Sequence, residues 1–373
     1  MLERFFKALR EGDVKAVEGQ ATKDPSLVTA YAPNQWCCRE IPLGVAAGRD
    51  DFALATLLLD LGADPNQKTA WWAGGFAPLH VVSAEQVEMI DLLIDRGANV
   101  DVQAAAALAR LGELTALLDH DPFLVNKPGG DGGRPLHFAA DAEVAKLLVD
   151  RGATLDPVDV DHGSTPAQWA VRDRQDVTRF LIAKGAKTDL FMLAALGEEG
   201  RLSEWLEDNP EDATKVLSPE EFASPGSKGG HIYQYVLTGF GSTALHVAAR
   251  CGSAPAIRLL HEAGADIAVR GGYDDQTPLH FAASADKVDA IRQLAQLGAD
   301  LNALSGSEHK TPPLVWAIVF GAVESVRVLL EMKADVTPAV TKSVKAGVKG
   351  DFQQHSDSPM GAWKQIQELV AAG

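Results

Sequence analysis

The chain repeats a short motif along most of its length. The tetrapeptide Thr277-Pro278-Leu279-His280 recurs in full or partial copies among the 373 residues, and a Gly-Ala-Asp-like tripeptide closes most copies. The closing glycines Gly62 and Gly97 lie 35 residues apart, and Gly264 and Gly298 lie 34 apart. A period of this length is typical of a solenoid, in which each unit buries its apolar face only by stacking on its neighbours.

The residues of one copy predict two helices. Pro278 stands at the first position of the first helix, where its missing N–H is not needed, and Thr277 caps that helix. A second helix is expected over residues 287–296, and Gly298 takes the left-handed conformation that ends it. The spacing of its apolar residues is helical. Those expected to face the core are Val288, Ile291 and Leu294.

The full signature, Thr277-Pro278-Leu279-His280-Phe281-Ala282 followed by Gly-Ala-Asp, closely resembles that of the ankyrin-repeat family. The resemblance covers residues 1–336 in pieces. It implies an all-α solenoid of about ten helix–turn–helix repeats with hairpin fingers, whose fingers and first helices form the usual binding face. It also assigns the motif histidines to hydrogen bonds within each repeat rather than to a metal site. These are His80, His137, His246 and His280.

Three copies lack both the tetrapeptide and a finger. They lie at residues 5–28, 104–125 and 191–216, and two finger-bearing copies follow each of them. This order predicts a three-repeat block built three times within one continuous solenoid. The blocks are expected at residues 1–101, 102–187 and 188–306.

Two segments depart from the repeat. Residues 217–240 are rich in Gly, Pro and Ser at their middle, which predicts a mobile insertion into a finger of the third block. Residues 307–373 are expected to hold a final repeat, up to about residue 336, and then a capping helix that begins near Ser358-Pro359. Trp363, Ile366 and Leu369 are expected on the apolar face of that helix.

Charge and cysteine usage exclude several classes of partner. The chain has 34 Lys and Arg against 51 Asp and Glu, which gives a formal charge of −17. An acidic chain repels phosphate backbones and anionic membrane surfaces, so neither nucleic acid nor a membrane is an expected partner. The N-terminus shows no signal-peptide pattern, and three cysteines make no disulfide framework. We therefore expect a cytoplasmic protein.

The fingers carry residues that suit chemistry. Asp131 belongs to the glycine-rich run 129–133, and Asp161-His162 belongs to a neighbouring finger, so the three side chains could face one ligand. His162 is an inserted residue beside a carboxylate, and histidine titrates near neutrality. If the protein is an enzyme, the expected catalytic residues are Asp131, Asp161 and His162.

Other polar and aromatic residues are expected to line the same groove or a mobile lid over it. An open alternative is that Asp161 and Asp274 only accept backbone hydrogen bonds in their own hairpins, and that the tryptophans only cover the preceding finger. The ligand-binding candidates are Trp36, Trp71, Trp72, Arg172, Asp173, His231, Tyr233, Tyr235, Arg250, Tyr273, Asp274 and Asp275.

Two functions remain open at this point. No nucleophile elbow, phosphate loop, HExxH pair or calcium loop occurs, so neither a cofactor nor a metal is expected, and the first hypothesis is a scaffold that holds a protein or peptide partner in its groove. The second is an enzyme or receptor for a small polar, sugar-like ligand. A scaffold would spread its anchors over many fingers, whereas an active site would gather them.

Overall fold

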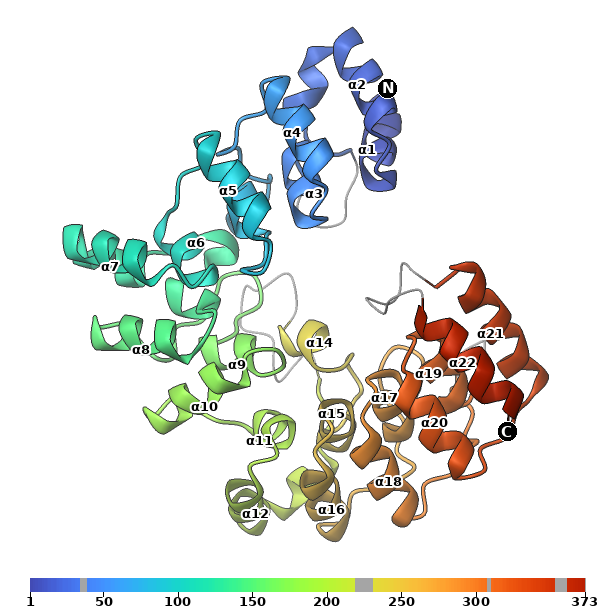
Figure 1. Cartoon of the computed structure of the whole chain (residues 1–373). Helices are drawn as coiled ribbons and strands as arrows, with labels where there is room; N and C mark the ends of the chain where they lie inside the picture. Colours follow the sequence, from blue (N-terminus) through green and yellow to red (C-terminus); the bar gives the residue numbers. More distant parts are fainter. Residues whose placement is uncertain (34–38, 219–230, 307–309, 353–360, 373) are drawn as a thin grey trace. The chain divides into compact units, whose positions relative to one another are not determined.

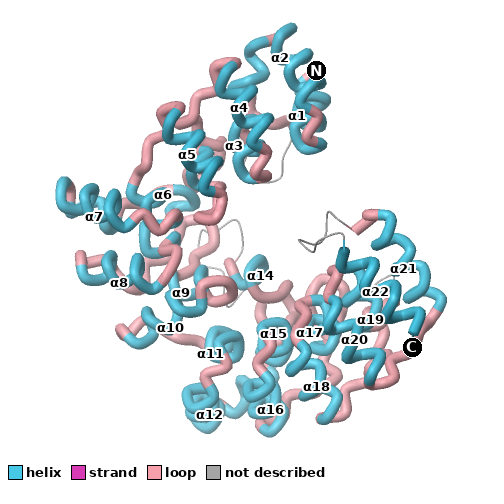
Figure 2. Tube along the Cα trace, viewed as in Figure 1, coloured by secondary structure: helices cyan, strands magenta, loops and turns pink. Residues whose placement is uncertain are grey.

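The computed structural model describes residues 1–33, 39–218, 231–306, 310–352 and 361–372 (Figure 1). In these residues the regular secondary structure is helical, and the fingers contribute only isolated bridges such as Gly271 with Gln276 (Figure 2). The all-α repeat fold predicted from the sequence is confirmed. No helix in the described ranges has the length and apolarity that crossing a membrane requires.

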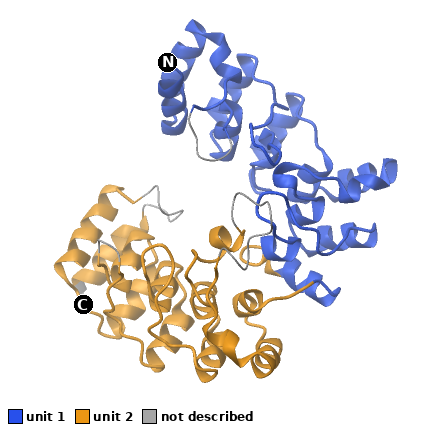
Figure 3. Cartoon of the chain, turned by 180° about the vertical axis from the view of Figure 1, so that it is seen from behind, with its two compact units in different colours: residues 1–170, 176–186, 224–229 blue, residues 171–175, 187–223, 230–373 orange. Residues whose placement is uncertain are grey.

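The chain forms two compact units (Figure 3). Unit 1 holds residues 1–170 and 176–186, and unit 2 holds residues 171–175 and the described residues from 187 onward. The three-repeat blocks stay a prediction.

Unit 1 stacks six helix pairs, in which first helices contact first helices. The pairs are α1 (Leu2–Glu11) with α2 (Val14–Lys23), α3 (Pro42–Gly48) with α4 (Phe52–Asp60), η2 (Pro78–His80) with α5 (Val87–Asp95), α6 (Val102–Ala107) with α7 (Leu111–His120), η5 (Pro135–Phe138) with α8 (Ala142–Asp150), and α9 (Pro166–Ala170) with α10 (Gln175–Ala183).

Unit 2 stacks five pairs, with the first helices in one row and the second helices in another (Figure 1). The pairs are α11 (Leu190–Leu196) with α12 (Glu199–Asp208), α15 (Ala244–Cys251) with α16 (Ala254–Glu262), α17 (Pro278–Ser284) with α18 (Val288–Gln296), α19 (Pro313–Val319) with α20 (Val323–Glu331), and α21 (Pro338–Lys349) with α22 (Gly361–Ala372).

The predicted copy agrees with α17 and α18 except at one core position. Pro278 opens α17, and Gly298 has a φ of 93° after α18. Ile291 and Leu294 are fully buried, but Val288 is only half-buried and Ala290 takes its place in the core. The α-helical period of 3.6 residues favours positions 290, 291 and 294 over a strict spacing of three.

The fingerless copies share a local structure. After the second helix each turns into a 3₁₀ helix that starts at a proline. In two of them the preceding aspartate caps the turn, since Asp24 accepts the Ser26 N–H at 3.2 Å and Asp121 accepts the Phe123 N–H at 3.0 Å. The three 3₁₀ helices are η1 (Pro25–Thr29), η3 (Pro122–Asn126) and η6 (Pro210–Thr214).

The motif histidines make the expected hydrogen bonds. Within each repeat Nδ1 accepts the N–H of the residue before the first helix, as in Thr277 to His280 at 3.2 Å. Nε2 then donates to a carbonyl of the next finger, as in His280 to Thr311 at 2.9 Å. His80 precedes a fingerless copy, and its Nε2 lies 2.9 Å from the Asp101 carboxylate instead. A side chain thus replaces the missing finger carbonyl.

The C-terminal helix packs as a cap. Trp363 and Ile366 of α22 are fully buried, and the Trp363 indole N–H donates to the Ile318 carbonyl at 2.8 Å. Residues 337–373 were expected to lie outside the repeat, but α21 packs on α19 as a further first helix. Thr337 caps α21 and Pro338 opens it, so this Thr-Pro pair was the sequence signal.

Residues 219–230 of the predicted insertion lie outside the described residues. The part that follows contains the short helix α14 (Tyr233–Val236). Ile232, Tyr233 and Leu237 are buried, and the Tyr233 ring lies 6.3 Å from that of Phe191 in α11. This part of the insertion is therefore packed on unit 2.

Candidate functional site

Unit 1 has shortened first helices around residues 78–170. From Pro135 to Gly152 the chain runs 17 residues, against 20 from Pro278 to Gly298. Three missing residues remove nearly one helical turn, or about 4.5 Å. The first element of this copy is accordingly the 3₁₀ turn η5 rather than an α-helix.

Three fingers of unit 1 are tied together by backbone hydrogen bonds. The Asp131 N–H donates to the Gly74 carbonyl at 3.1 Å, and the Asp131 carbonyl accepts the Val160 N–H at 2.8 Å and the Asp161 N–H at 3.2 Å. Asp131 therefore holds the middle finger against both neighbours. Its left-handed backbone, with φ 53°, is part of this connection.

Glycines allow these fingers to approach closely. A side chain at Gly130 would overlap the Phe76 ring, and one at Gly132 would overlap Val160. The glycine-rich run 129–133 is thus explained by packing between fingers.

The structure brings the three predicted catalytic residues together. One ligand atom from each of Asp131, Asp161 and His162 can be chosen so that all three lie within 4.8 Å of one another. The residues are 9%, 5% and 8% exposed, respectively. With Asp159 they form what we call the finger cluster. The cluster is enclosed, although the sequence predicted side chains that line an open groove.

Asp159 holds the hairpin, a role that the sequence left open for Asp161. Its carboxylate accepts the backbone N–H groups of His162 at 2.5 Å and Ser164 at 3.0 Å, and the Trp169 indole N–H at 2.9 Å. Burial raises the pKa of Asp159, but the hydrogen bonds from His162 and Trp169 outweigh it and hold that pKa below its usual value. Sequence reasoning missed this residue, although it stands two places before Asp161 in the same finger.

The Asp161 carboxylate makes its hydrogen bond outside its own hairpin. Its Oδ2 accepts the Trp71 indole N–H at 3.2 Å, while Oδ1 is buried without a hydrogen-bond partner among the described residues. His162 lies between the two aspartates, with Nδ1 3.4 Å from Asp159 Oδ1 and Nε2 3.7 Å from Asp161 Oδ2. Asp161 is therefore not occupied by hairpin hydrogen bonds.

Burial and like charge perturb the cluster. Burial raises the pKa of Asp131 to about 7, the Asp161 and Asp159 carboxylates add to the rise, and His162 opposes it. Burial lowers the pKa of His162, but its contact with Asp159 and the other carboxylates raises it overall. Three carboxylates around one imidazole favour a bound proton or another cation.

A row of aromatic rings adjoins His162 of this cluster. The His162 ring stands edge-on to Trp169 at 5.2 Å, Trp169 contacts Phe138 at 6.0 Å, and Phe138 contacts Phe76 at 6.2 Å. Trp169 limits the rotation of the His162 imidazole, and Phe138 and Phe76 support Trp169.

Other predicted residues line hollows of unit 2. Arg172, Asp173 and Arg250 border a hollow of about 680 Å³, together with Lys287. Arg172 pairs with Asp173 through two guanidinium nitrogens at 2.6–2.9 Å. Burial and the neighbouring Arg172 lower the pKa of Arg250.

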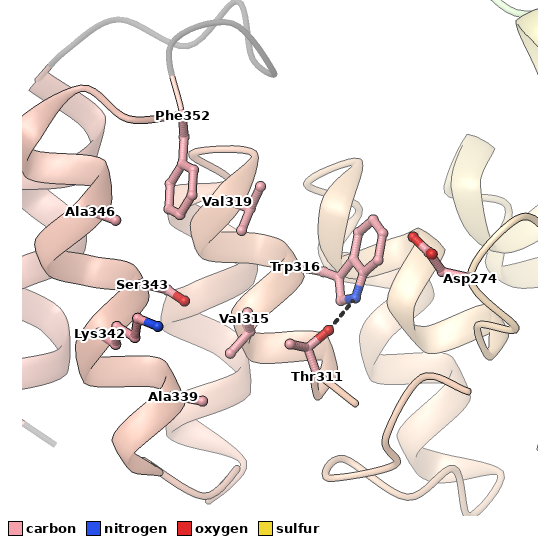
Figure 4. Close-up of a pocket in the computed structure, with 10 residues that line it drawn as sticks. All are labelled: Asp274, Thr311, Val315, Trp316, Val319, Ala339, Lys342, Ser343, Ala346 and Phe352. Carbon is pink, nitrogen blue, oxygen red and sulfur yellow. Dashed lines mark hydrogen bonds between the residues drawn. The ribbon is translucent and has the colours of Figure 1, made fainter. Parts of the chain in front are cut away.

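Two further hollows adjoin along the first helices of unit 2. Tyr235, Tyr273 and Asp274 border a hollow of about 200 Å³ with Trp316. Asp274 and Trp316 also border a hollow of about 550 Å³ that reaches α21 and Phe352 (Figure 4). The Trp316 indole N–H donates to Thr311 Oγ1 at 3.0 Å, which fixes the ring (Figure 4).

Family models identify the repeat. A model described as "Ankyrin repeats (3 copies)" matches residues 102–192, 208–305 and 245–339, and one described as "Ankyrin repeat" matches residues 74–105. The chain belongs to the ankyrin-repeat family. It is also similar to the crystal structure of the human ASB11 ankyrin repeat domain, at 24% identity and a TM-score of 0.37, over 63% of this chain and 99% of that one.

The remaining predicted residues occupy other positions on the ankyrin framework. Tyr233 is buried and its hydroxyl donates to Asp189 at 2.7 Å, while His231 is buried with its ring 4.5 Å from that of Tyr233. Trp72 is partly exposed with its ring 6.1 Å from that of Trp71, and Asp275 pairs with Arg270 at 3.6 Å. Trp36 lies outside the described residues.

One aromatic position was missed although the sequence shows it. The residue three places after the motif proline is aromatic in four ankyrin copies, and this position lies on the first-helix face. The four residues are Phe138, Trp169, Phe281 and Trp316. Counting from the proline that opens each first element would have found them, with Pro313 rather than Pro312 as the start in the last copy.

Proposed function

We propose that this ankyrin-repeat protein binds a protein or peptide partner, and that the first-helix face of unit 2 holds an extended segment of that partner. The observation that carries the proposal is the pair of hollows that share Asp274 and Trp316. Because they adjoin, they offer a surface from α14 across α17 and α19 to α21. Contact residues that are spread along several repeats suit an extended ligand.

The chemistry of this face fits a protein partner. Tyr235 and Tyr273 are 56% and 76% exposed, and Trp316 is half-buried between them and α21. Tyrosine and tryptophan are the residues that most often dominate binding at protein interfaces. The charge of −17 favours a neutral or basic partner over nucleic acid or an anionic membrane. Cysteine usage favours action in the cytoplasm.

A selection experiment tests this proposal. A displayed peptide library is selected on the whole chain, and enriched peptides are titrated against wild type, Trp316→Ala and Phe123→Ala. Loss of the central indole should weaken binding by tenfold or more. Phe123 is 89% exposed in η3 of unit 1 and is the matched control, which should bind like wild type. Peptides that bind both variants equally would contradict the proposal.

The finger cluster of unit 1 supports a second candidate function, a site for a small ligand. Asp131, Asp161 and His162 converge rather than spread, and this is the arrangement that distinguishes a ligand or catalytic site from a scaffold surface. Trp71 donates to one of the three, and the paired rings of Trp71 and Trp72 lie beside the cluster. A ligand that carries positive charge or hydroxyl groups would match the carboxylates.

A further inference from the structure

We propose that Asp131, Asp161 and His162 of unit 1 bind a divalent transition-metal ion of the Zn²⁺ type. The proposal gives a chemical class to the ligand of the finger cluster and rests on the second candidate function only for the existence of a ligand there. It does not depend on partner binding by unit 2.

The three residues come from two fingers and present the right donor atoms. Two carboxylate oxygens and one imidazole nitrogen lie within 4.8 Å of one another. Bonds of about 2.0–2.2 Å to a shared ion place neighbouring ligand atoms some 3–4 Å apart, so a small closure brings all three onto one ion. Three protein ligands leave positions for water or substrate.

Asp161 has an unsatisfied oxygen at this place. The residue is 5% exposed, and its Oδ1 has no hydrogen-bond partner among the described residues. A buried carboxylate oxygen without a partner is costly, and the cost is greater beside other carboxylates. A metal ion between Asp131 and Asp161 would give the Asp161 oxygen a partner and would offset the repulsion between the two carboxylates.

Asp159 orients His162 for this role. With Nδ1 facing the Asp159 carboxylate at 3.4 Å, the ring turns Nε2 toward Asp161. A carboxylate behind the imidazole is the usual arrangement at metal-bound histidines, where it fixes the tautomer and the ring orientation. Asp159 is itself held by the Ser164 and Trp169 N–H groups, so it is a positioning residue and not a ligand.

The donor set and the scaffold define the class of ion. Imidazole with two carboxylates favours Zn²⁺, Co²⁺ or Mn²⁺ over the all-oxygen sites of Mg²⁺ and Ca²⁺. Backbone hydrogen bonds of Asp131 with Gly74, Val160 and Asp161 hold the fingers together, so only a small closure is needed. Little order has to be gained on binding, which favours affinity.

Direct titration of the whole chain tests the site without any substrate. After treatment with a chelator, Zn²⁺ is titrated by calorimetry, Co²⁺ by visible absorption, and Mg²⁺ serves for comparison. We expect saturable binding of one Zn²⁺ and a Co²⁺ spectrum with a nitrogen ligand. Asp161→Asn and His162→Ala should each weaken Zn²⁺ by tenfold or more, and Asp159→Asn by about 10–100-fold.

The matched control is His120→Ala, which removes an exposed histidine of the same unit and should bind Zn²⁺ like wild type. Circular dichroism of each variant establishes that it is folded, and the conservative Asp161→Asn covers the case in which His162→Ala is not. No saturable Zn²⁺ binding to wild type, equal binding to Asp161→Asn, or Mg²⁺ binding as tight as Zn²⁺ would each overturn the proposal.

Discussion

The aromatic residue three places after the motif proline makes different contacts in the two units. In unit 1 Phe138 and Trp169 pack beneath the finger cluster, and the Trp169 indole N–H is bound to Asp159. In unit 2 Phe281 and Trp316 border open hollows instead, and the Trp316 indole N–H is bound to Thr311. The repeat thus decides where an aromatic side chain lies but not what it contacts.

Finger geometry and helix length account for this difference. Unit 1 combines a shortened first element at η5 with fingers joined through Asp131, so polar groups are enclosed. In unit 2 helices α15, α17 and α19 are complete, and Tyr273 at a finger tip stays exposed. Closed fingers suit a small ligand, and open ones suit an extended partner.

The largest expected effect is acid destabilisation, and it should be greater in unit 2. Burial lowers the pKa of His137 in unit 1, and of His246 and His280 in unit 2, to about 4. In the unfolded chain these histidines bind protons below about pH 6.5, whereas in the folded chain they stay neutral down to about pH 4. The contribution of these histidines to the free energy of unfolding is therefore full above about pH 6.5 and falls as the pH drops toward 4. The loss at pH 5 is roughly 2 kcal/mol per histidine.

Urea unfolding at pH 7.5 and pH 5.0, with hydrogen exchange to locate the opening unit, measures this effect. His246→Gln should flatten the pH dependence of unit 2, whereas His120→Gln, a change at an exposed histidine, should not. If unit 1 opens first at pH 5, the difference in buried histidines does not govern acid stability.

Core substitutions should affect the two units alike. Leu136 and Leu279 hold the same motif position and are each 1% exposed. Truncation of either to alanine is expected to cost about 2–5 kcal/mol, because each fills a core shared with neighbouring copies. Chemical denaturation of both variants provides the comparison. If only Leu279→Ala lowers the free energy of unfolding, the short η5 copy is not packed as a true repeat.

Much of the fold could be predicted because repetition supplies independent copies of each signal. The helix pairs, the bonds of the motif histidines and the burial of Trp363 follow from residue type and period. Helix α21 was missed because Thr337-Pro338 is not followed by Leu-His, as Thr277-Pro278 is, and no Gly-Ala-Asp-like tripeptide closes the copy.

For the site, Asp131, Asp161 and His162 could be selected because they lie in neighbouring fingers and His162 is an inserted residue beside a carboxylate. The hairpin role of Asp159 could not, because Asp159 and Asp161 are two residues apart and only the fold decides which one faces the backbone. The first-helix aromatics were overlooked since their residue type is equally typical of a core.

The two aspartates of one finger, Asp159 and Asp161, give the most direct test of the claim that unit 1 holds a built ligand site. We measure the melting temperatures of wild type, Asp159→Asn and Asp161→Asn in chelator and in excess Zn²⁺. In chelator, Asp159→Asn should melt lower because it weakens three hydrogen bonds. Asp161→Asn should melt at or above wild type because it removes a repelled buried charge. Zn²⁺ should raise the melting temperature of wild type but not of Asp161→Asn. If Asp161→Asn instead melts several degrees below wild type in chelator, the Asp161 carboxylate serves to hold Trp71 of the neighbouring finger, and the finger cluster is structural.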